Sequence, residues 1–132
     1  MHTESILRIQ SAVTLERSEP EPDLAVVTGP PLRYRERHPS GQDIALVIEV
    51  AETSLHRDRL KGTSYAAAAV PVYWIVNLRQ RRLEVYQSPR GEDYAERLLL
   101  ETSDVVTVGQ GFQNIATIRV ADLIPDHIAS TS

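Results

Sequence analysis

Two acidic residues stand in apolar segments of this 132-residue sequence and are its first candidates for chemistry. Glu49 lies inside the most apolar run, 43–51, and Asp23 opens the preceding run, 23–27. An ionised carboxylate inside an apolar strand is costly unless it has a partner. Consecutive strands are usually neighbours in a sheet, so these two carboxylates could face each other near one sheet edge. Mg²⁺ between them would stabilise the pair, because it takes oxygen ligands and often binds one or two carboxylates.

Ordinary structural roles would also explain both acids. An acid at the start of a strand often caps a turn, and a glutamate within a strand can pair with an arginine of a neighbouring strand. The chain has 13 arginines, so such partners are plentiful. Charge placement alone therefore leaves the metal site and the structural role both open.

The only lysine of the chain lies in the next segment. Lys61 stands three residues after Asp58 and four residues before Tyr65. On a helix, this spacing places the three side chains on one face. Such an Asp–Lys pair is commonly a solvated ion pair worth about 0.3 kcal/mol. The functional alternative places the Lys61 ammonium near the metal, where it could orient a water or stabilise charge developing on a phosphate.

Composition and charge exclude several classes of function. The absence of cysteine rules out disulfides, thiolate zinc sites and a cysteine nucleophile. A net charge of −4 argues against a protein that binds nucleic acid by bulk charge. No apolar run has the length of a signal peptide or a membrane span, so we expect a cytoplasmic protein that does not contact membranes.

A short series of arginines could still contact a phosphate backbone locally. Arg33, Arg35 and Arg37 alternate with other residues in a polar loop, 32–42. Arginine contacts to phosphate position a protein on nucleic acid without reading its sequence. The more common role of such a series is a solvated loop.

The elements that must position these residues are several strands and one central helix. Apolar and polar patterns predict strands at 5–16, 23–27, 43–51, 72–78, 82–87, 94–101, 105–108 and 115–120. A helix is predicted over 55–69, with Leu55, Leu60 and the alanines on its buried side and Pro71 after its end. Residues 79–81 form a tight hairpin connection, 88–93 a loop, and 120–124 a terminal helical turn. We expect one α/β or α+β domain over 1–132, with a frayed tail at 126–132.

Several residue strings, taken in order, closely resemble one known family. They are PDLAVV (22–27), LVIEVAETS (46–54), DRLK (58–61), YA (65–66) and VPVYWIV (70–76). Each string is weak alone, but their order and spacing resemble the Uma-type family of restriction-endonuclease-like proteins in the PD-(D/E)xK superfamily. The resemblance extends from about residue 6 to about residue 123.

The resemblance implies a fold, an activity and a set of site residues. The fold would be a mixed sheet with helices packed on it, and the activity Mg²⁺- or Mn²⁺-dependent hydrolysis of DNA. Asp23 matches the aspartate of the PD element, and Glu49 matches the acid of the (D/E)xK strand. Ala51 stands where the lysine is expected, and Lys61 of the following helix matches that lysine. Tyr65 matches a family tyrosine to which we assign no role, and Asp58 is a possible supporting residue.

The sequence also departs from the family pattern at its beginning. Family members usually carry an N-terminal helical stretch before the first strand, whereas the first predicted strand begins here at residue 5. Without that stretch we expect one sheet face to be uncovered, and an apolar face of this kind usually marks an interface. The alternative function is therefore a degenerate, non-catalytic module that binds nucleic acid or protein, and in either case a homodimer is expected.

Overall fold

The computed structural model describes residues 5–9, 22–28, 43–110 and 113–124. Of the two helices in this part of the chain, neither is long and apolar enough to cross a bilayer. The elements, in chain order, are β1 (Ser5–Ile9), β2 (Leu24–Thr28), β3 (Ile44–Ala51), α1 (Leu55–Ala67), β4 (Val72–Asn77), β5 (Arg82–Arg90), β6 (Asp93–Glu101), β7 (Val105–Gln110), β8 (Gln113–Arg119) and α2 (Val120–Leu123).

The first six strands form one mixed sheet in chain order, β1-β2-β3-β4-β5-β6. β3 and β4 are parallel and are connected through α1, whereas every other neighbouring pair in this sheet is antiparallel. β7 and β8 form a separate two-stranded hairpin. The predicted fold class, a mixed sheet with one central helix after the strand that carries Glu49, is therefore confirmed.

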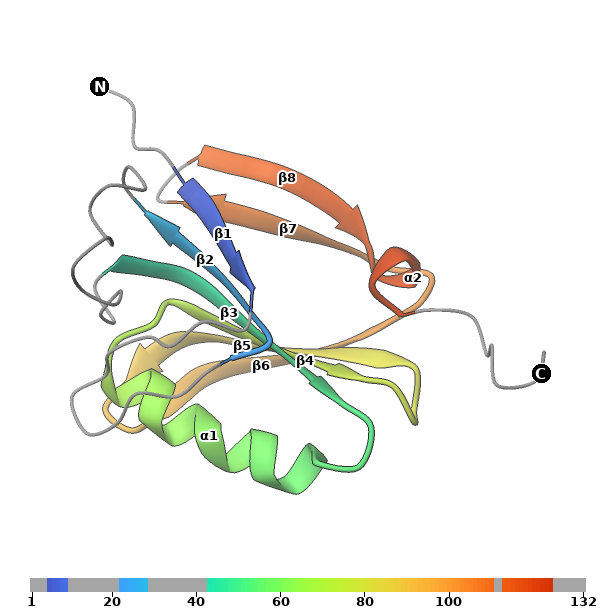
Figure 1. Cartoon of the computed structure of the whole chain (residues 1–132), viewed down its shortest axis with the longest axis horizontal. Helices are drawn as coiled ribbons and strands as arrows, with labels where there is room; N and C mark the ends of the chain where they lie inside the picture. The colour runs from blue at the N-terminus through green and yellow to red at the C-terminus, as the bar shows by residue number, and fades with distance from the viewer. Residues whose placement is uncertain (1–4, 10–21, 29–42, 111–112, 125–132) are drawn as a thin grey trace.

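The sheet is covered on both faces, which gives two hydrophobic cores (Figure 1). One core lies between the sheet and α1 and includes Tyr65, Tyr73 and Ile75. The other lies between the sheet and the hairpin β7–β8 with α2, where Trp74 of β4 packs in a cluster with Val106 and Val120. β3 is buried along almost its whole length, as expected for a strand covered on both sides.

The expectation of an uncovered sheet face is wrong. The hairpin β7–β8 and α2 pack over the face opposite α1, and they bury Leu46, Trp74 and Leu83 to 2% exposure or less. Short apolar runs at the end of the sequence predicted strands but did not say which surface those strands would cover. The predicted homodimer loses its main argument, because that argument was the free face.

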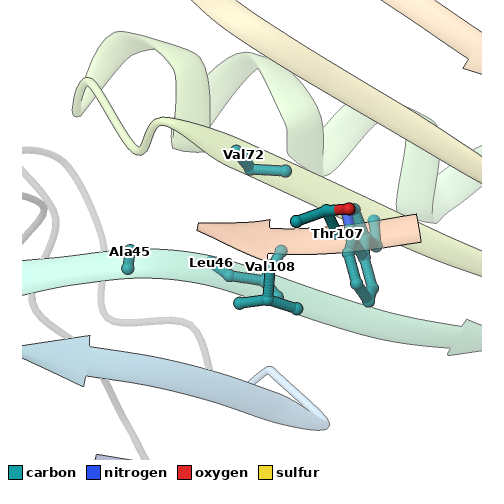
Figure 2. Close-up of a pocket in the computed structure, with 6 residues that line it drawn as sticks. Ala45, Leu46, Val72, Thr107 and Val108 are labelled. Carbon is teal, nitrogen blue, oxygen red and sulfur yellow. The ribbon is translucent and has the colours of Figure 1, made fainter. Parts of the chain in front are cut away.

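A small pocket lies in this second core (Figure 2). Its lining is mostly apolar and comes from β3, β4 and β7: Ala45, Leu46, Val72, Trp74, Thr107 and Val108. Leu46 and Trp74 belong to the hairpin-side core, on the opposite side of the sheet from α1. The pocket is therefore a gap in the packing between the sheet and the hairpin, separate from the predicted acidic site.

One predicted connection is corrected by the structure. The predicted loop 88–93 is a tight connection, because β5 continues to Arg90 and β6 begins at Asp93, leaving only Gly91 and Glu92 between them. Gly91 has φ 65°, a conformation that glycine adopts without strain. The second half of the predicted strand 5–16, the loop 32–42 and the tail 126–132 lie outside the described residues.

The buried side of α1 also differs from the prediction. The helix ends at Ala67, and its buried residues are Asp58, Tyr65 and Ala66. Leu60 is 57% exposed, so its predicted place in the core is wrong. Each residue of an α-helix is rotated by about 100° from the last, so Leu60 lies about 140° around the helix from Tyr65. Leu55 is only partly buried, although it packs against the core on this side of the sheet.

We expect two leucine-to-alanine substitutions, one in the hairpin-side core and one on the exposed side of α1, to differ in their effect on the free energy of unfolding. Leu83→Ala should lower the free energy of unfolding by about 2–5 kcal/mol, because Leu83 is fully buried in the hairpin-side core. Leu60→Ala should change it by less than about 0.5 kcal/mol, because the side chain is exposed and alanine is a good helix former. Urea denaturation followed by circular dichroism measures both. A large loss on Leu60→Ala would contradict the placement of α1.

Candidate functional site

The pairing of β2 with β3 brings Asp23 beside Glu49. The strands are antiparallel with Leu24 opposite Ile48, so Asp23, one residue before Leu24, reaches the level of Glu49. The Val50 amide donates to Asp23 Oδ2 at 2.7 Å, and the Asp23 amide donates to Glu49 Oε1 at 3.3 Å. The predicted meeting of the two acids is therefore present in the structure, and each acid accepts a hydrogen bond from the neighbouring strand.

Glu49 is a buried carboxylate with a raised pKa. Its residue is only 3% exposed, on the sheet face that α1 covers. Burial raises the pKa of Glu49 above its ordinary value of 4.5, and the Lys61 ammonium and the Asp23 amide offset only part of this effect. The ionised form of Glu49 is thus held in the fold at a net cost. A bound cation would reduce that cost.

Helix α1 brings Lys61 to the same carboxylate. The Lys61 ammonium lies 3.5 Å from Glu49 Oε2 and 3.4 Å from Asp58 Oδ1, with its side chain 38% exposed. Asp58 is buried, and its other oxygen, Oδ2, accepts a hydrogen bond from the Ser54 hydroxyl at 2.8 Å. The helical Asp58–Lys61 pair is therefore part of a larger group that includes a buried strand glutamate, rather than an isolated solvated pair.

Tyr65 makes the third contact of Glu49, and this contact gives Tyr65 a structural role. Its hydroxyl donates to Glu49 Oε2 at 3.2 Å, and its side chain is fully buried. Burial first, and then the nearby Glu49 carboxylate, raise the pKa of Tyr65 above its ordinary range. The phenol therefore stays protonated and orients the carboxylate by donating to it.

The donor set fits a hard divalent cation that keeps several waters. Asp23 and Glu49 provide two neighbouring carboxylates, and Mg²⁺ is commonly held by one or two carboxylates with water and phosphate completing its coordination. Within the described ranges, no three His, Cys, Asp or Glu side chains form a group that could hold a metal. Two carboxylates would therefore leave most of the coordination of such an ion to water or phosphate.

The structure adds residues that the sequence patterns did not indicate. The Tyr73 hydroxyl donates to the Asp58 carbonyl at 2.6 Å and so ties the first turn of α1 to β4. Glu84 of β5 is fully buried and forms an ion pair with Arg59. In the sequence, Glu84 is a polar residue between the apolar Leu83 and Val85, and this alternation is typical of an exposed side chain.

The predicted phosphate contacts from the arginine series are not placed by the structure. Arg33, Arg35 and Arg37 lie outside the described residues. Their possible role stays a prediction from the sequence. The described part of the candidate site is therefore the group formed by Asp23, Glu49, Asp58, Lys61 and Tyr65.

Comparison with known proteins identifies the family and the fold. Residues 3–121 match the Uma2 family, whose description is "Putative restriction endonuclease". The sequence matches no curated protein. Among solved structures, the fold is similar to the crystal structure of a "putative nuclease belonging to DUF820" from Anabaena variabilis, with a TM-score of 0.68 and 16% sequence identity. That match covers 90% of this chain and 67% of the other, and at this identity it shows a shared fold.

We expect Glu49→Gln to stabilise the metal-free fold at neutral pH. The pKa of Glu49 is higher in the fold than in the unfolded chain. The contribution of the Glu49 side chain to the free energy of unfolding is therefore fully present below about pH 4.5, and it is lost as the pH rises through the folded-state pKa. Glutamine removes the buried charge and can still accept from Tyr65, at the loss of the 3.3 Å hydrogen bond from the Asp23 amide. The melting temperature of the variant, measured in a chelator, should therefore exceed that of the parent by an amount that grows from pH 4 to pH 7.

A matched control is available three residues further on. Glu52 is exposed in the connection between β3 and α1, and Glu52→Gln removes the same charge from the surface. Glu52→Gln should show no such gain in melting temperature. A Glu49→Gln protein that melts below the parent at pH 7 would contradict the net cost assigned to the buried carboxylate.

Proposed function

The chain belongs to the Uma2 family of restriction-endonuclease-like proteins, and from this premise we propose that it is a Mg²⁺- or Mn²⁺-dependent nuclease that hydrolyses DNA phosphodiester bonds. The observation that carries the proposal is the position of the Lys61 ammonium, between Glu49 and Asp58 and on the same carboxylate that adjoins Asp23. Two carboxylates with an ammonium beside them suit phosphoryl chemistry, in which negative charge develops on the phosphate oxygens.

The residues of the site have distinct roles in this proposal. Asp23 and Glu49 would hold the cation, which when bound activates water and neutralises phosphate charge. Tyr65 keeps the Glu49 carboxylate oriented through its hydrogen bond to Oε2. Lys61 would orient the attacking water or stabilise charge on the phosphate, and Asp58 holds Lys61 at its place on the helix.

One observation favours the non-catalytic alternative. Glu49 already has three donors in the described structure: the Asp23 amide, the Tyr65 hydroxyl and the Lys61 ammonium. A carboxylate satisfied in this way can stay folded without a cation, as a degenerate member that binds nucleic acid or protein would require. Metal affinity therefore separates the two functions.

Some further features of the chain remain proposals. A single domain over 1–132, a cytoplasmic location and a homo-oligomeric state are expected from the sequence. The phosphate contacts of Arg33, Arg35 and Arg37 are expected in the same way. They would add local positive charge to a protein whose net charge is −4.

We predict that Lys61→Arg folds like the parent and loses at least about 100-fold of DNA cleavage. The planar guanidinium keeps the charge, but it cannot occupy the position of a compact ammonium between two carboxylates. Nicking of supercoiled plasmid with Mg²⁺ or Mn²⁺ measures the effect. The reverse exchange, Arg57→Lys, lies on the exposed side of the same helix and should leave cleavage unchanged. Equal cleavage by Lys61→Arg and the parent would remove Lys61 from the mechanism.

Metal binding gives an independent prediction. Isothermal titration of the folded parent with Mg²⁺ or Mn²⁺ should show binding that Asp23→Asn weakens at least about tenfold, because the amide removes one of two anionic ligands. Glu52→Asn, outside the carboxylate pair, is the control and should bind like the parent. A folded parent that binds neither ion would contradict the nuclease proposal and support the non-catalytic alternative.

A further inference from the structure

A second buried carboxylate lies under α1, outside the candidate metal site. Glu84 of β5 is fully buried, and both of its oxygens are bonded to Arg59 of α1, from Nε at 3.1 Å and from Nη2 at 2.6 Å. The Tyr86 hydroxyl donates to Glu84 Oε1 at 2.6 Å, and the Arg97 guanidinium lies 3.9 Å from the same oxygen. Burial alone would raise the pKa of Glu84, but the donors outweigh it and hold that pKa below its usual value.

Glu84 and Glu49 lie in one row of the sheet. Glu49 is opposite Ile75 of β4, and Ile75 is opposite Glu84 of β5. Side chains at directly opposite positions point to the same face, so both carboxylates face α1. Neighbouring strands are about 4.8 Å apart, which separates the two residues by roughly 10 Å across the strands.

Helix α1 spans this gap with residues two positions apart. Arg59 reaches Glu84, and Lys61 reaches Glu49. Two residues on a helix differ by about 200° in direction, so the two cations leave α1 on opposite flanks. Between them, Tyr73 of the intervening strand donates to the Asp58 carbonyl. This turn of the helix is therefore held at three points across three neighbouring strands, β3, β4 and β5.

The three points differ in strength. The Arg59–Glu84 pair is bidentate, and its acceptor is fully buried, which is the strong form of a charge-assisted hydrogen bond. The Lys61 ammonium makes two longer contacts, at 3.4 and 3.5 Å, on a flexible side chain. The Arg59–Glu84 pair therefore holds this turn of the helix more firmly than the Lys61 contacts do.

We propose that Arg59 and Glu84 are positioning residues of the nuclease site, which set the rotation of α1 so that the Lys61 ammonium lies against Glu49. The proposal rests on the proposed function for its catalytic meaning, while its structural part can be tested alone. Tyr86 and Arg97 complete the anchor, since Tyr86 donates to Glu84 and the Arg97 guanidinium lies 5.8 Å from the centroid of the Tyr86 ring.

The single lysine of the chain allows a direct test. Protein labelled with ¹⁵N at the lysine side chain gives one side-chain ammonium signal, and its order parameter reports how firmly Lys61 is held. In metal-free parent protein we expect a restricted ammonium. In Arg59→Gln and Glu84→Gln we expect that restriction to be lost, so that the order parameter falls to the value of a freely rotating surface lysine. Arg57→Gln removes the same charge from an exposed position of α1 and should leave the signal unchanged.

Activity provides the second measurement on the same variants. A misplaced Lys61 should lower kcat about 10- to 100-fold with little change in KM, because geometry at the reacting centre is lost while substrate binding is not. If Arg59→Gln does not fold, Tyr86→Phe is the milder variant. It removes one donor to Glu84, keeps the ring beneath Arg97, and should loosen the ammonium in the same direction but less.

The outcomes separate the two proposals. A lower melting temperature in Arg59→Gln with an unchanged Lys61 signal would mean that the pair only stabilises the fold, and it would overturn the positioning role. A parent protein without DNA cleavage, but with a Lys61 signal that loosens in Arg59→Gln and Glu84→Gln, would overturn the nuclease function and leave the positioning role supported.

Discussion

The structure depends on the burial of two carboxylates in one row of its central sheet. Glu49 and Glu84 lie on the face covered by α1, two strands apart, and each is at most 3% exposed. An ionised group at such a depth must have close donors, or the fold loses more free energy than a single core contact provides. The position of α1 follows from this requirement, because the cations nearest to the two acids, Lys61 and Arg59, both lie on that helix.

This requirement explains why the core under α1 is rich in tyrosine. Four tyrosines lie between the helix and the sheet, and the centroids of their neighbouring rings are 5.0 to 6.5 Å apart. Every one donates its hydroxyl to a carboxylate or a carbonyl: Tyr65 to Glu49, Tyr73 to the Asp58 carbonyl, Tyr86 to Glu84 and Tyr94 to the Val70 carbonyl. A tyrosine ring fills apolar space while its hydroxyl satisfies a buried acceptor. The helix can therefore pack with few apolar residues of its own, and the acids remain paired in a largely dehydrated layer.

The sequence was informative where the physics is local and less so where it depends on packing between elements. Glu49 could be identified because a charge within an apolar strand needs an explanation, and the pairing of neighbouring strands then placed Asp23 beside it. Lys61 stood out as the only lysine of the chain, and the family resemblance indicated a catalytic role for it, whereas its spacing from Asp58 alone favoured a solvated pair. Glu84 was missed because an acid in an alternating strand is usually exposed, and its burial depends on a helix whose rotation the pattern did not specify. Leu60 was misplaced for the same reason, and the cover of the second face by β7–β8 is a long-range contact without a local signal.

The two buried acids also differ in how readily their partners can leave, and this difference bears on the proposed function. The planar guanidinium of Arg59 hydrogen-bonds both oxygens of Glu84, and exchanging that partner would break two hydrogen bonds at once. Glu49 is paired with an ammonium at 3.5 Å, whose flexible stem lets it move by a rotation of the side chain. A carboxylate that must admit a cation and a phosphate needs a partner of the second kind, whereas a carboxylate that fixes a helix needs the first. In a chain with 13 arginines and one lysine, the lysine lies at the carboxylate where a movable partner has a chemical use, and an arginine lies where only rigidity is required.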